Sequence, residues 1–360
     1  MRNVLVLGGG KIGSLISLLL AECGGYSVFL ADIIEIDPST NGLDHDAVKI
    51  IRTDVTDRSG LQALIDKTPI TAIVSALPYY CNIAVAQLAR DNHLHYLDLT
   101  EDVEVCQAIE SLSQSADQAF IPQCGLAPGM ISIIANNLMD HFDTIDTVKM
   151  RVGALPVHPS NALKYSLTWS TDGLINEYGN RCVGVEDGEM VSLLPLEGYE
   201  TIELDGLLYE AFNTSGGLGT LAETYRGKVQ HMNYKTLRYP GHCEKIHLLM
   251  QDLKLNEDRD TLKRILENAI PKTLQDVALI YVSVSGYQQG ELFEENYVKK
   301  IYPTDIGGKL WSAIQVTTAS GICAVLDLLL SDGGSHRGFV TQESFSLEEV
   351  LANRFGKHYI

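Results

Sequence analysis

The segment Gly8-Gly9-Gly10-Lys11-Ile12-Gly13 has the glycine spacing of a dinucleotide-binding loop. An apolar run precedes the segment and another follows it, so the loop would join a strand to a helix. In that setting Gly8 permits the tight turn, Gly10 lets the backbone approach a pyrophosphate, and Gly13 lets helix and strand pack closely. A glycine-rich turn in a cofactor-free α/β protein is the alternative. The loop residues expected to bind the cofactor are Gly8, Gly10, Lys11, Ile12 and Gly13.

Two further features extend this loop toward a whole cofactor site. Asp32 follows Gly13 by 19 residues, at the end of the next expected strand, where a carboxylate hydrogen-bonds the adenosine ribose. A carboxylate there repels a 2′-phosphate, and Ile33 and Ile34 supply no arginine to receive one, so NAD(H) is favoured over NADP(H). A second turn, called the SALP turn below, comprises Ser75, Ala76, Leu77 and Pro78. It is expected to lie against the nicotinamide ribose and diphosphate. The alternative is a plain strand end at which Pro78 starts the next helix.

The first third of the chain alternates short β-rich runs with helical patterns, which is typical of βαβ units and a parallel, doubly wound sheet. The expected strands are residues 3–7, 27–31, 48–52, 72–76, 95–98 and 119–123. The expected helices are residues 12–22, 59–67, 82–91 and 101–116.

From residue 147 onward, strand-like runs recur with hairpin signals such as Asp187-Gly188 and Asp205-Gly206. The elements expected there are strands over 148–152, 165–169, 201–204, 279–285 and 297–301, and helices over 260–269, 309–330 and 347–353. We therefore predict an α/β fold with an inserted domain. Its parts are a Rossmann domain over 1–125, an α+β substrate and dimerisation domain over 126–305, and a return to the Rossmann domain with the C-terminal tail over 306–360.

Composition limits the class of protein. Hydrophobic residues make up 45% and charged residues 20%, the balance of a globular protein. A net charge of -19 disfavours nucleic-acid binding, which needs clustered Lys and Arg. We find no charged leader with a cleavage site and no apolar run of about 20 residues, so we expect a soluble, cytoplasmic protein without a membrane partner. Seven scattered cysteines without a CxxC motif predict reduced, mostly buried thiols and no metal site.

Short motifs recur in a fixed order over almost the whole chain. After the glycine loop and the SALP turn come YLDLTE (96–101), CGLAPGM (124–130), WSTDG (169–173) and TLRYPGH (236–242). In this ordered set the chain resembles the saccharopine dehydrogenase superfamily, and its ending ANRFGKHY (352–359) resembles the lysine 6-dehydrogenase group within it. The resemblance implies a Rossmann domain with an inserted α+β domain, a homodimer, and NAD⁺-dependent oxidation of an amine on an amino acid.

Three positions depart from what the resemblance implies for the glutamate-forming saccharopine reductases. Gln87 stands where that group carries a catalytic lysine, and Ala127 where it carries an aspartate. Asp172 stands where that group has an arginine for a substrate carboxylate. Saccharopine carries extra carboxylates whereas lysine offers a second ammonium, so these departures favour oxidative deamination of L-lysine to 2-aminoadipate 6-semialdehyde and ammonia. An enzyme that joins or splits an amine and a keto or aldehyde acid, and a non-catalytic NAD-binding sensor, are the alternatives.

Amine oxidation requires ligands for the charged groups of the substrate and a base that removes the amine proton. Arg238 is expected to hold the α-carboxylate through two parallel hydrogen bonds, or else to form a salt bridge. Asp172 is expected to hold the lysine ammonium, or to act as the N-cap of a helix. Asp98, at a strand end on the cofactor edge, is expected to be a base or substrate ligand, or to cap the next helix.

Two more residues are expected to line the site. Tyr165 is a candidate substrate ligand, and His242 can shuttle a proton if its pKa is near neutral, a structural role being the alternative. Cys124 lacks a nearby basic motif and is therefore expected to be a buried strand-end residue and no nucleophile. The catalytic candidates are thus Asp98, Asp172 and His242, and the substrate ligands are Tyr165 and Arg238.

Overall fold

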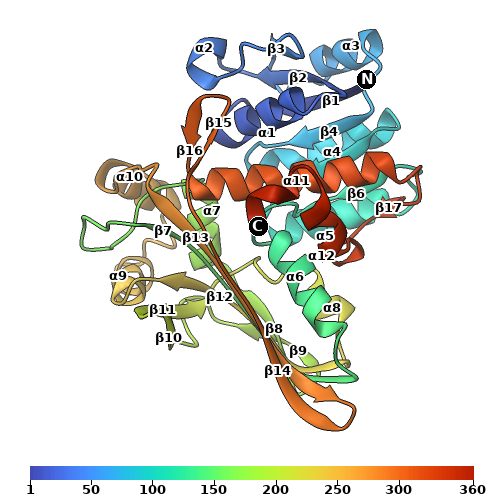
Figure 1. Ribbon diagram of the computed structural model, residues 1–360. Coiled ribbons are helices and arrows are strands. Elements are labelled where there is room, and N and C mark those ends of the chain that lie inside the picture. Colours follow the sequence, from blue (N-terminus) through green and yellow to red (C-terminus); the bar gives the residue numbers. More distant parts are fainter. The chain divides into compact units, whose positions relative to one another are not determined.

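The computed structural model describes residues 1–360, with only the backbone described for Thr40 and Asn41. The chain divides into two compact units, each with its own sheet (Figure 1). Unit 1 comprises Met1–Leu126, Asp305–Trp311 and Gln315–Ile360, and unit 2 comprises Ala127–Thr304 and Ser312–Ile314. A parallel Rossmann-like sheet in one unit and a mixed sheet in the other confirm the predicted α/β class.

Unit 1 holds a seven-stranded parallel sheet in the order β17-β6-β5-β4-β1-β2-β3. Its strands are β1 (Arg2–Leu7), β2 (Tyr26–Asp32), β3 (Val48–Arg52), β4 (Ala72–Ser75), β5 (His95–Asp98), β6 (Ala119–Ile121) and β17 (Gly338–Phe339). The sheet grows in one direction from β1 to β3 and in the other from β4 to β6. The switch point between β1 and β4 is where open α/β sheets bind ligands, at the carboxyl ends of the strands.

Helices cover this sheet. They are α1 (Lys11–Glu22), α2 (Pro38–Asn41), α3 (Arg58–Lys67), η1 (Tyr79–Cys81), α4 (Asn82–Asp91), α5 (Val103–Ser113), η3 (Gln342–Ser344), α12 (Leu347–Ala352) and η4 (Gly356–Tyr359), with most of α11 (Ala313–Ser331). The predicted strands of the first third are confirmed to within two residues, because their β-rich runs alternate regularly with amphipathic helices. Residues 48–52, 95–98 and 82–91 are predicted with their observed bounds.

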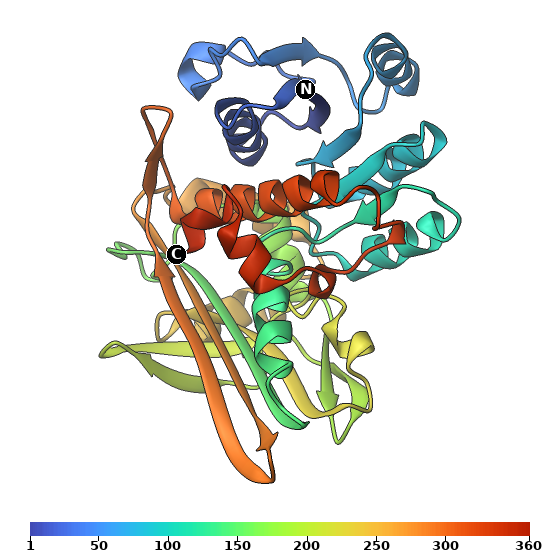
Figure 2. The same cartoon turned by 45° about the vertical axis from the view of Figure 1, so that its right-hand side comes forward.

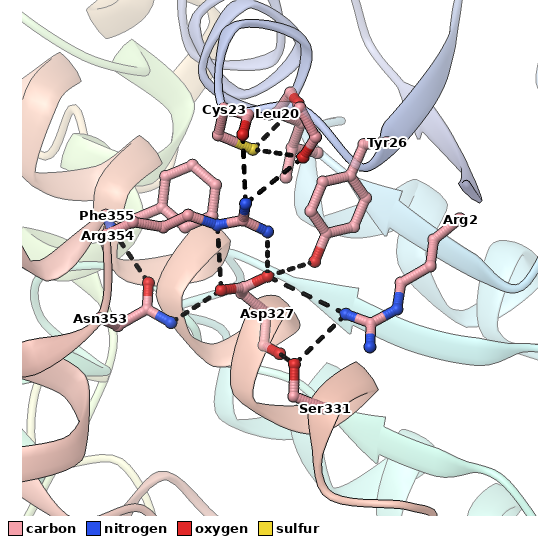
Figure 3. Close-up of polar contacts among 10 residues, drawn as sticks. Arg2, Leu20, Cys23, Tyr26, Asp327, Ser331, Asn353, Arg354 and Phe355 are labelled. Atoms are coloured by element: carbon pink, nitrogen blue, oxygen red, sulfur yellow. Dashed lines mark hydrogen bonds and ion pairs between the residues drawn. The ribbon is translucent and has the colours of Figure 1, made fainter.

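The C-terminal tail is fastened to unit 1 around a single buried carboxylate (Figure 3). Asp327 of α11 accepts hydrogen bonds from Tyr26 Oη (2.6 Å) at the start of β2 and from Asn353 Nδ2 (2.9 Å) in the tail. Arg354 adds two more, from Nη2 (2.6 Å) and Nε (3.2 Å). Burial alone would raise the pKa of Asp327, but these hydrogen bonds outweigh burial and hold the pKa below its usual value.

Unit 2 holds an eight-stranded mixed sheet with the path β10-β11-β12-β7-β13-β14, and β8 joins β12 to β9. The strands are β7 (Thr144–Pro156), β8 (Cys182–Glu186), β9 (Glu189–Leu193), β10 (Glu200–Leu204), β11 (Leu207–Asn213), β12 (Val229–Arg238), β13 (Asp276–Gln288) and β14 (Glu291–Ile301). Of these pairings β12 with β7 is parallel and the others are antiparallel. The long hairpin of β13 and β14 is clearest in Figure 2.

The helices of unit 2 are shorter. They are α6 (Met130–Met139), α7 (Thr171–Gly179), α8 (Leu221–Thr224), α9 (His242–His247), η2 (Leu248–Asp252) and α10 (Arg259–Ala269). A small hairpin of β15 (Thr304–Ile306) and β16 (Lys309–Trp311) follows β14. The predicted hairpins at Asp187-Gly188 and Asp205-Gly206 are confirmed; both aspartates have positive φ (49° and 54°), which such turns require.

Two predicted elements are wrong. Residues 165–169 form no strand; their apolar side chains pack instead into a core cluster with α7 and α10. The helix expected over 309–330 begins later, at Ala313, because Asp276 accepts the N–H groups of Ala313 (2.6 Å) and Ile314 (3.1 Å) and so fixes its first turn. Residues 309–311 are β16.

Helix α11 also corrects an expectation about membranes. By length and composition Ala313–Ser331 is long and apolar enough to cross a bilayer, contrary to our reading of the sequence. Of this apolar stretch, 78% is buried inside the protein. A helix in the core of a soluble protein can have the same length and composition as a membrane-spanning helix.

Candidate functional site

The glycine loop lies at the switch point and depends on its glycines in two different ways. Gly8 has φ of 98°, and a Cβ there would lie 2.7 Å from the carbonyl oxygen of Ala76. A Cβ on Gly13 would lie 1.8 Å from the carbonyl oxygen of Gly8. These two glycines therefore let protein backbones pack closely. A Cβ on Gly10, by contrast, would meet no atom within 4 Å, so the space over Gly10 suits a ligand.

Helix α1 begins directly behind that space. Lys11 and Ile12 form its first turn, and Gly10, at the N-cap position, makes no side-chain cap hydrogen bond. The helix dipole and the N–H groups of a first turn attract negative charge. The loop therefore fits the pyrophosphate of a dinucleotide, and binding of NAD by these residues stays a prediction.

Asp32 holds the loops after β1 and β2 together. Its Oδ2 accepts the N–H of Gly9 (2.5 Å) and its Oδ1 accepts the N–H of Ile34 (2.8 Å). A carboxylate oxygen has more than one lone pair, so these bonds leave Asp32 able to accept from a ribose hydroxyl.

Arg52 adds a feature that the sequence reading missed. It is the β3 neighbour of Asp32 in the sheet, and its Nε donates to the carbonyl oxygen of Ile33 (3.2 Å). Ile33 and Ile34 themselves supply no arginine, but the pairing of β2 with β3 places one beside them. A guanidinium is a common ligand of the 2′-phosphate of NADP, so Arg52 opposes Asp32 in the choice of cofactor.

The SALP turn closes the other side of the switch point. Ser75 Oγ donates to Oδ1 of Asn82 (2.7 Å) at the start of α4, and the N–H of Ala76 donates to the carbonyl oxygen of Leu7 (2.8 Å). Pro78 is the N-cap of η1, which confirms that it starts the next helical segment. A contact of Ser75, Ala76, Leu77 or Pro78 with the nicotinamide half stays a prediction.

Asp98 is completely buried at the end of β5. It accepts hydrogen bonds from Tyr96 Oη (2.7 Å) and from the N–H groups of Thr100 (2.9 Å) and Gln123 (3.1 Å). Burial raises the pKa of Asp98 to about 6, although these hydrogen bonds oppose the rise. The alternative that Asp98 caps the next helix is wrong, because Asp102 is the N-cap of α5.

Cys124 is a buried thiol, as predicted, and lies three residues beyond the end of β6. It donates to the carbonyl oxygen of Ile121 (3.0 Å) and accepts from Gln342 Nε2 (3.1 Å). Burial raises the pKa of Cys124 well above its usual value, so the nucleophilic thiolate is disfavoured.

In unit 2, three of the predicted residues come together in one buried cluster. Nε of Arg238, the last residue of β12, donates to Tyr178 Oη (2.8 Å), and Tyr178 Oη lies 3.0 Å from Nε2 of His242. Nδ1 of His242 lies 2.8 Å from the carbonyl oxygen of Leu163, which can only accept, so Nδ1 carries the proton and Nε2 accepts from Tyr178. The Tyr165 ring packs 5.3 Å from the imidazole.

This geometry bears on the role expected of His242. Burial and, second, the neighbouring charge of Arg238 together lower the pKa of His242 to about 3. The imidazole is therefore neutral at physiological pH and positions Tyr178 by accepting its hydroxyl proton. A proton shuttle near pH 7 needs a pKa near neutral, so the role of His242 as a shuttle stays a prediction that this environment disfavours.

Arg238 itself is a buried cation between aromatic rings. Its guanidinium carbon lies 5.1 Å from the ring centre of Tyr165 and 5.7 Å from that of Tyr178. Its Nη1 donates to the carbonyl oxygen of Leu237 (2.8 Å), and its Nη2 lies 4.0 Å from Oε2 of Glu177. Only 3% of the side chain is exposed, so this is a held and largely desolvated cation.

Asp172 lies outside that cluster. On α7 its Oδ2 binds Nζ of Lys263 (2.6 Å), and both side chains are about a third exposed (37% and 36%). The alternative that Asp172 is the N-cap is wrong, because Ser170 has that position and its Oγ accepts the N–H of Gly173 (3.2 Å). The Asp172 carboxylate, which we expected to bind the substrate ammonium, is therefore already paired with the ammonium of Lys263.

Besides Arg52 and Tyr178, Glu177 is a site residue that the sequence did not predict. It lies on the same helix as Asp172 but is buried, with 9% of its side chain exposed, beside Arg238. The available signal was an acidic residue inside the apolar pattern of the helix, between Ile175 and Tyr178.

Comparisons with known proteins agree with this architecture. Residues 4–120 match the saccharopine dehydrogenase NADP binding domain, and residues 125–360 match the saccharopine dehydrogenase C-terminal domain. Fold and matches together define an oxidoreductase with a pyridine nucleotide-binding domain. The chain belongs to the saccharopine dehydrogenase family.

Individual relatives are distant. The mitochondrial alpha-aminoadipic semialdehyde synthase of Rattus norvegicus is 22% identical over an alignment of 379 positions, which covers 100% of this 360-residue chain but only 37% of that protein. Apo saccharopine dehydrogenase (L-Glu forming) from Saccharomyces cerevisiae superposes with a TM-score of 0.77 at 17% identity, covering 99% and 98% of the two chains. C. glutamicum DAP dehydrogenase in complex with DAP gives 0.51 at 11% identity, covering 99% and 97%. At such identities the structures show the fold alone.

Proposed function

We propose that the protein oxidises the side-chain amine of an amino acid with NAD⁺, and that its substrate is L-lysine. Lysine, NAD⁺ and water would give 2-aminoadipate 6-semialdehyde, ammonia, NADH and a proton. A bound nicotinamide would accept the hydride from the carbon that bears the amine, and water would hydrolyse the resulting imine.

The observation that carries the proposal is Arg238. Tyr178 and the carbonyl of Leu237 orient its guanidinium, and it is nearly buried. A fixed guanidinium binds a carboxylate more strongly than one in water, because little entropy is lost and little solvent competes. The substrate is therefore expected to carry a carboxylate.

The residue at position 172 supports a substrate with fewer carboxylates than saccharopine. The family resemblance implies an arginine there as a carboxylate ligand, whereas this chain has an aspartate that binds Lys263. One cationic ligand is thus missing, which favours an amino acid with a single carboxylate.

The choice of NAD⁺ is supported by Asp32 and opposed by Arg52. Asp32 lies beside the Gly9 N–H and so stands at the loop where the ribose of the cofactor would lie. The family description names NADP, and both nucleotides therefore belong in the assay.

The base that accepts the amine proton is proposed to be Asp98. His242 is neutral and already accepts a hydrogen bond, and Asp172 is paired with Lys263. Asp98, with a pKa of about 6, is mostly ionised at neutral pH and close to the range that suits a general base.

A second candidate function is an enzyme that joins or splits an amine and a keto or aldehyde acid. The matches to saccharopine dehydrogenase domains over residues 4–120 and 125–360 favour it. Such an enzyme would oxidise NADH only when amine and carbonyl acid are both supplied. We further propose that the protein is a homodimer in the cytoplasm, which light scattering and cell fractionation would test.

The proposed function is tested by NADH formation when lysine, ornithine or saccharopine is added to the purified protein with NAD⁺ or NADP⁺. We expect lysine to be the best substrate. A matched pair of variants checks the cofactor site: Gly10→Ala should weaken nucleotide binding with an unchanged Tm, since a Cβ there meets no protein atom within 4 Å. Gly13→Ala should lower the Tm, since its Cβ would meet the Gly8 carbonyl at 1.8 Å. Turnover of saccharopine but of neither lysine nor ornithine would contradict the proposal.

A further inference from the structure

We propose that strand β14 pairs with the β14 strand of a second copy of this chain, antiparallel and about a two-fold axis at Tyr297. This inference goes beyond the proposed reaction and rests on the homodimer proposed above, because it assigns the surface at which the two copies meet. The mixed sheets of the two copies of unit 2 then form one continuous sheet.

The first observation is that β14 is an edge strand. It stands last in the path β10-β11-β12-β7-β13-β14, and within the part of the chain that the structure describes its strand partner is β13 alone. The turn of the β13–β14 hairpin extends beyond the neighbouring strands (Figures 1 and 2). The outer side of such a strand presents a row of N–H and C=O groups with which a further strand can pair.

The second observation is that β14 lacks several features by which proteins commonly protect an edge. Its sequence, ELFEENYVKKI, is 11 residues long, contains neither proline nor glycine, and pairs with β13 without a register shift. It also carries exposed apolar side chains. Leu292, Phe293 and Val298, with Tyr302 directly after the strand, are between 43% and 67% exposed. A long, regular edge with apolar side chains is expected to be covered by another strand.

The hydrogen-bond pattern limits the registers in which two copies of β14 can pair. In an antiparallel pair, residues directly opposite each other either both point their backbone groups toward the partner strand or both point them away. Because β14 pairs with β13 on one side, only alternate residues point these groups to the outer edge. Opposite residues must therefore be an even number of positions apart in sequence. A two-fold axis between identical strands must consequently pass through a residue.

Charge selects one of these registers. With the axis at Tyr297, Glu295 comes opposite Lys299 and Glu294 comes opposite Lys300, and the axis repeats both pairs. Directly opposite residues share a face of the sheet, so these side chains meet, and opposite charges in such positions stabilise pairing. Moving the axis by one residue in either direction places each of these charges opposite an uncharged side chain.

The same register covers exposed apolar side chains. Leu292 comes opposite Tyr302, and these two side chains are 67% and 53% exposed in the single chain. Phe293 comes opposite Ile301, and Tyr297 comes opposite itself at the axis. Apolar pairs therefore lie at the axis and at both ends of the paired segment, with the charged pairs between them.

Contacts within the chain leave the four charges able to form these pairs. Glu295 binds His141 (2.7 Å), and Glu294 accepts a hydrogen bond from Ser283 Oγ (2.9 Å). Lys300 binds the exposed carboxylate of Asp205 (2.7 Å). A carboxylate accepts more than two hydrogen bonds and an ammonium donates three, so pairs across the axis add to these contacts.

The test reverses the charges on one half of the strand at a time. Lys299→Glu with Lys300→Glu gives an acidic variant, and Glu294→Lys with Glu295→Lys gives a basic one. In a dimer of either variant like charges stand opposite each other, so the dissociation constant should rise on the order of 100-fold. An equimolar mixture of the two variants restores every opposite-charge pair and should form a heterodimer as tightly as the wild type dimerises.

A matched control separates this effect from that of net charge. Lys254→Glu with Lys272→Glu makes the same change in charge at two exposed lysines of unit 2 outside β14, and should leave the dissociation constant unchanged. Sedimentation over a dilution series measures each constant, the single chain having a mass of 39.5 kDa. Amide hydrogen exchange provides a second readout, since alternate N–H groups of β14 should exchange more slowly in the dimer than in the dissociated variants.

Each outcome decides the inference. Weaker dimers of both variants, with a heterodimer in the mixture, support it, and a misfolded variant could not give that heterodimer. A wild type that stays monomeric overturns it together with the homodimer. Dissociation constants of both variants equal to that of the control overturn pairing through β14 but leave a homodimer formed elsewhere. Failure of the mixture to associate overturns the register. Turnover of lysine enters none of these measurements, so its absence contradicts the proposed reaction alone.

Discussion

Each unit of the molecule contains a buried carboxylate beside an arginine, and the two pairs are built differently. In unit 1, Asp327 accepts hydrogen bonds at 2.6–3.2 Å from Tyr26, Asn353 and Arg354. In unit 2, Glu177 and Arg238 stand 4.0 Å apart, although they are at least as deeply buried.

The difference separates a structural ion pair from a candidate binding site. The hydrogen bonds to Asp327, on α11, come from β2 and the C-terminal tail, so they join segments far apart in sequence and stabilise the fold. Arg238 instead has its Nε and Nη1 fixed by the protein while Nη2 stands at a distance from Glu177. The hydrogen bonds to Asp327 suit stability, whereas a guanidinium oriented by Tyr178 and the Leu237 carbonyl suits recognition of a carboxylate.

The largest effect is expected at the separated pair. Arg238→Gln removes the proposed carboxylate ligand, so kcat/KM for lysine should fall by about 100- to 1000-fold, or about 3–4 kcal/mol. Cadaverine, the diamine without a carboxylate, should be turned over equally by variant and wild type. Initial rates of NADH formation measure both. A similar loss on cadaverine would show that Arg238 acts by holding the fold.

The next effect is expected at the hydrogen-bonded pair, on stability and not on kinetics. Arg354→Met leaves the buried Asp327 without two of its hydrogen bonds. We expect a loss of about 2–3 kcal/mol, at the lower end for a broken buried pair because 41% of the Arg354 side chain is exposed. Urea unfolding measures the loss, and lysine KM should be unchanged at temperatures where the variant is folded.

The same pair predicts a dependence on pH. The pKa of Asp327 is lower in the folded than in the unfolded chain, so its stabilisation is present above the unfolded pKa of about 4 and is lost as pH falls through the folded value. The stability difference between wild type and Arg354→Met should therefore shrink in acid. A difference that stays constant from pH 7 to pH 3 would contradict the structural role of the carboxylate charge.

Asp98 should behave in the opposite way. Burial raises its pKa to about 6 in the folded state, so ionisation between about pH 4 and pH 6 destabilises the fold as pH rises. Asp98→Asn can still accept the N–H groups of Thr100 and Gln123, and it should be as stable as the wild type or more stable at pH 7. Its kcat should fall steeply if Asp98 is the base. If Asp98→Asn keeps full activity while its stability depends on pH differently from that of the wild type, Asp98 has a structural role only.

The smallest effect is expected at the exposed pair. Asp172→Asn removes an ion pair of which about a third of each side chain is exposed, and should cost less than about 1 kcal/mol. Because Lys263 already occupies this carboxylate, kcat/KM for lysine should change by less than about 3-fold. A loss of about 100-fold would restore Asp172 as the ammonium ligand.

The features of unit 1 that sequence alone predicted are local ones. Each strand and helix of the βαβ pattern has its own periodicity, and the glycine loop needs only its neighbours to be interpreted. Arg52 was missed because its place beside Ile33 depends on the pairing of β2 with β3, which no local pattern states.

The site in unit 2 depends on contacts across long stretches of sequence. That Glu177 belongs to the site follows only from its proximity to Arg238, 61 residues later, and the lowered pKa of His242 follows from burial among side chains from several elements. Residues 165–169 resemble a strand in composition, but tertiary packing against α7 and α10 decides their conformation. Sequence named three members of the cluster and could not state their hydrogen bonds.

We propose above all that this chain removes the amine from a single amino acid. Its most direct test is the ratio of ammonia released to NADH formed when purified protein is given L-lysine and NAD⁺ alone. We expect one ammonia for each NADH, with no need for a keto acid. NADH change only when an amine and a keto or aldehyde acid are both present, without ammonia, would contradict it.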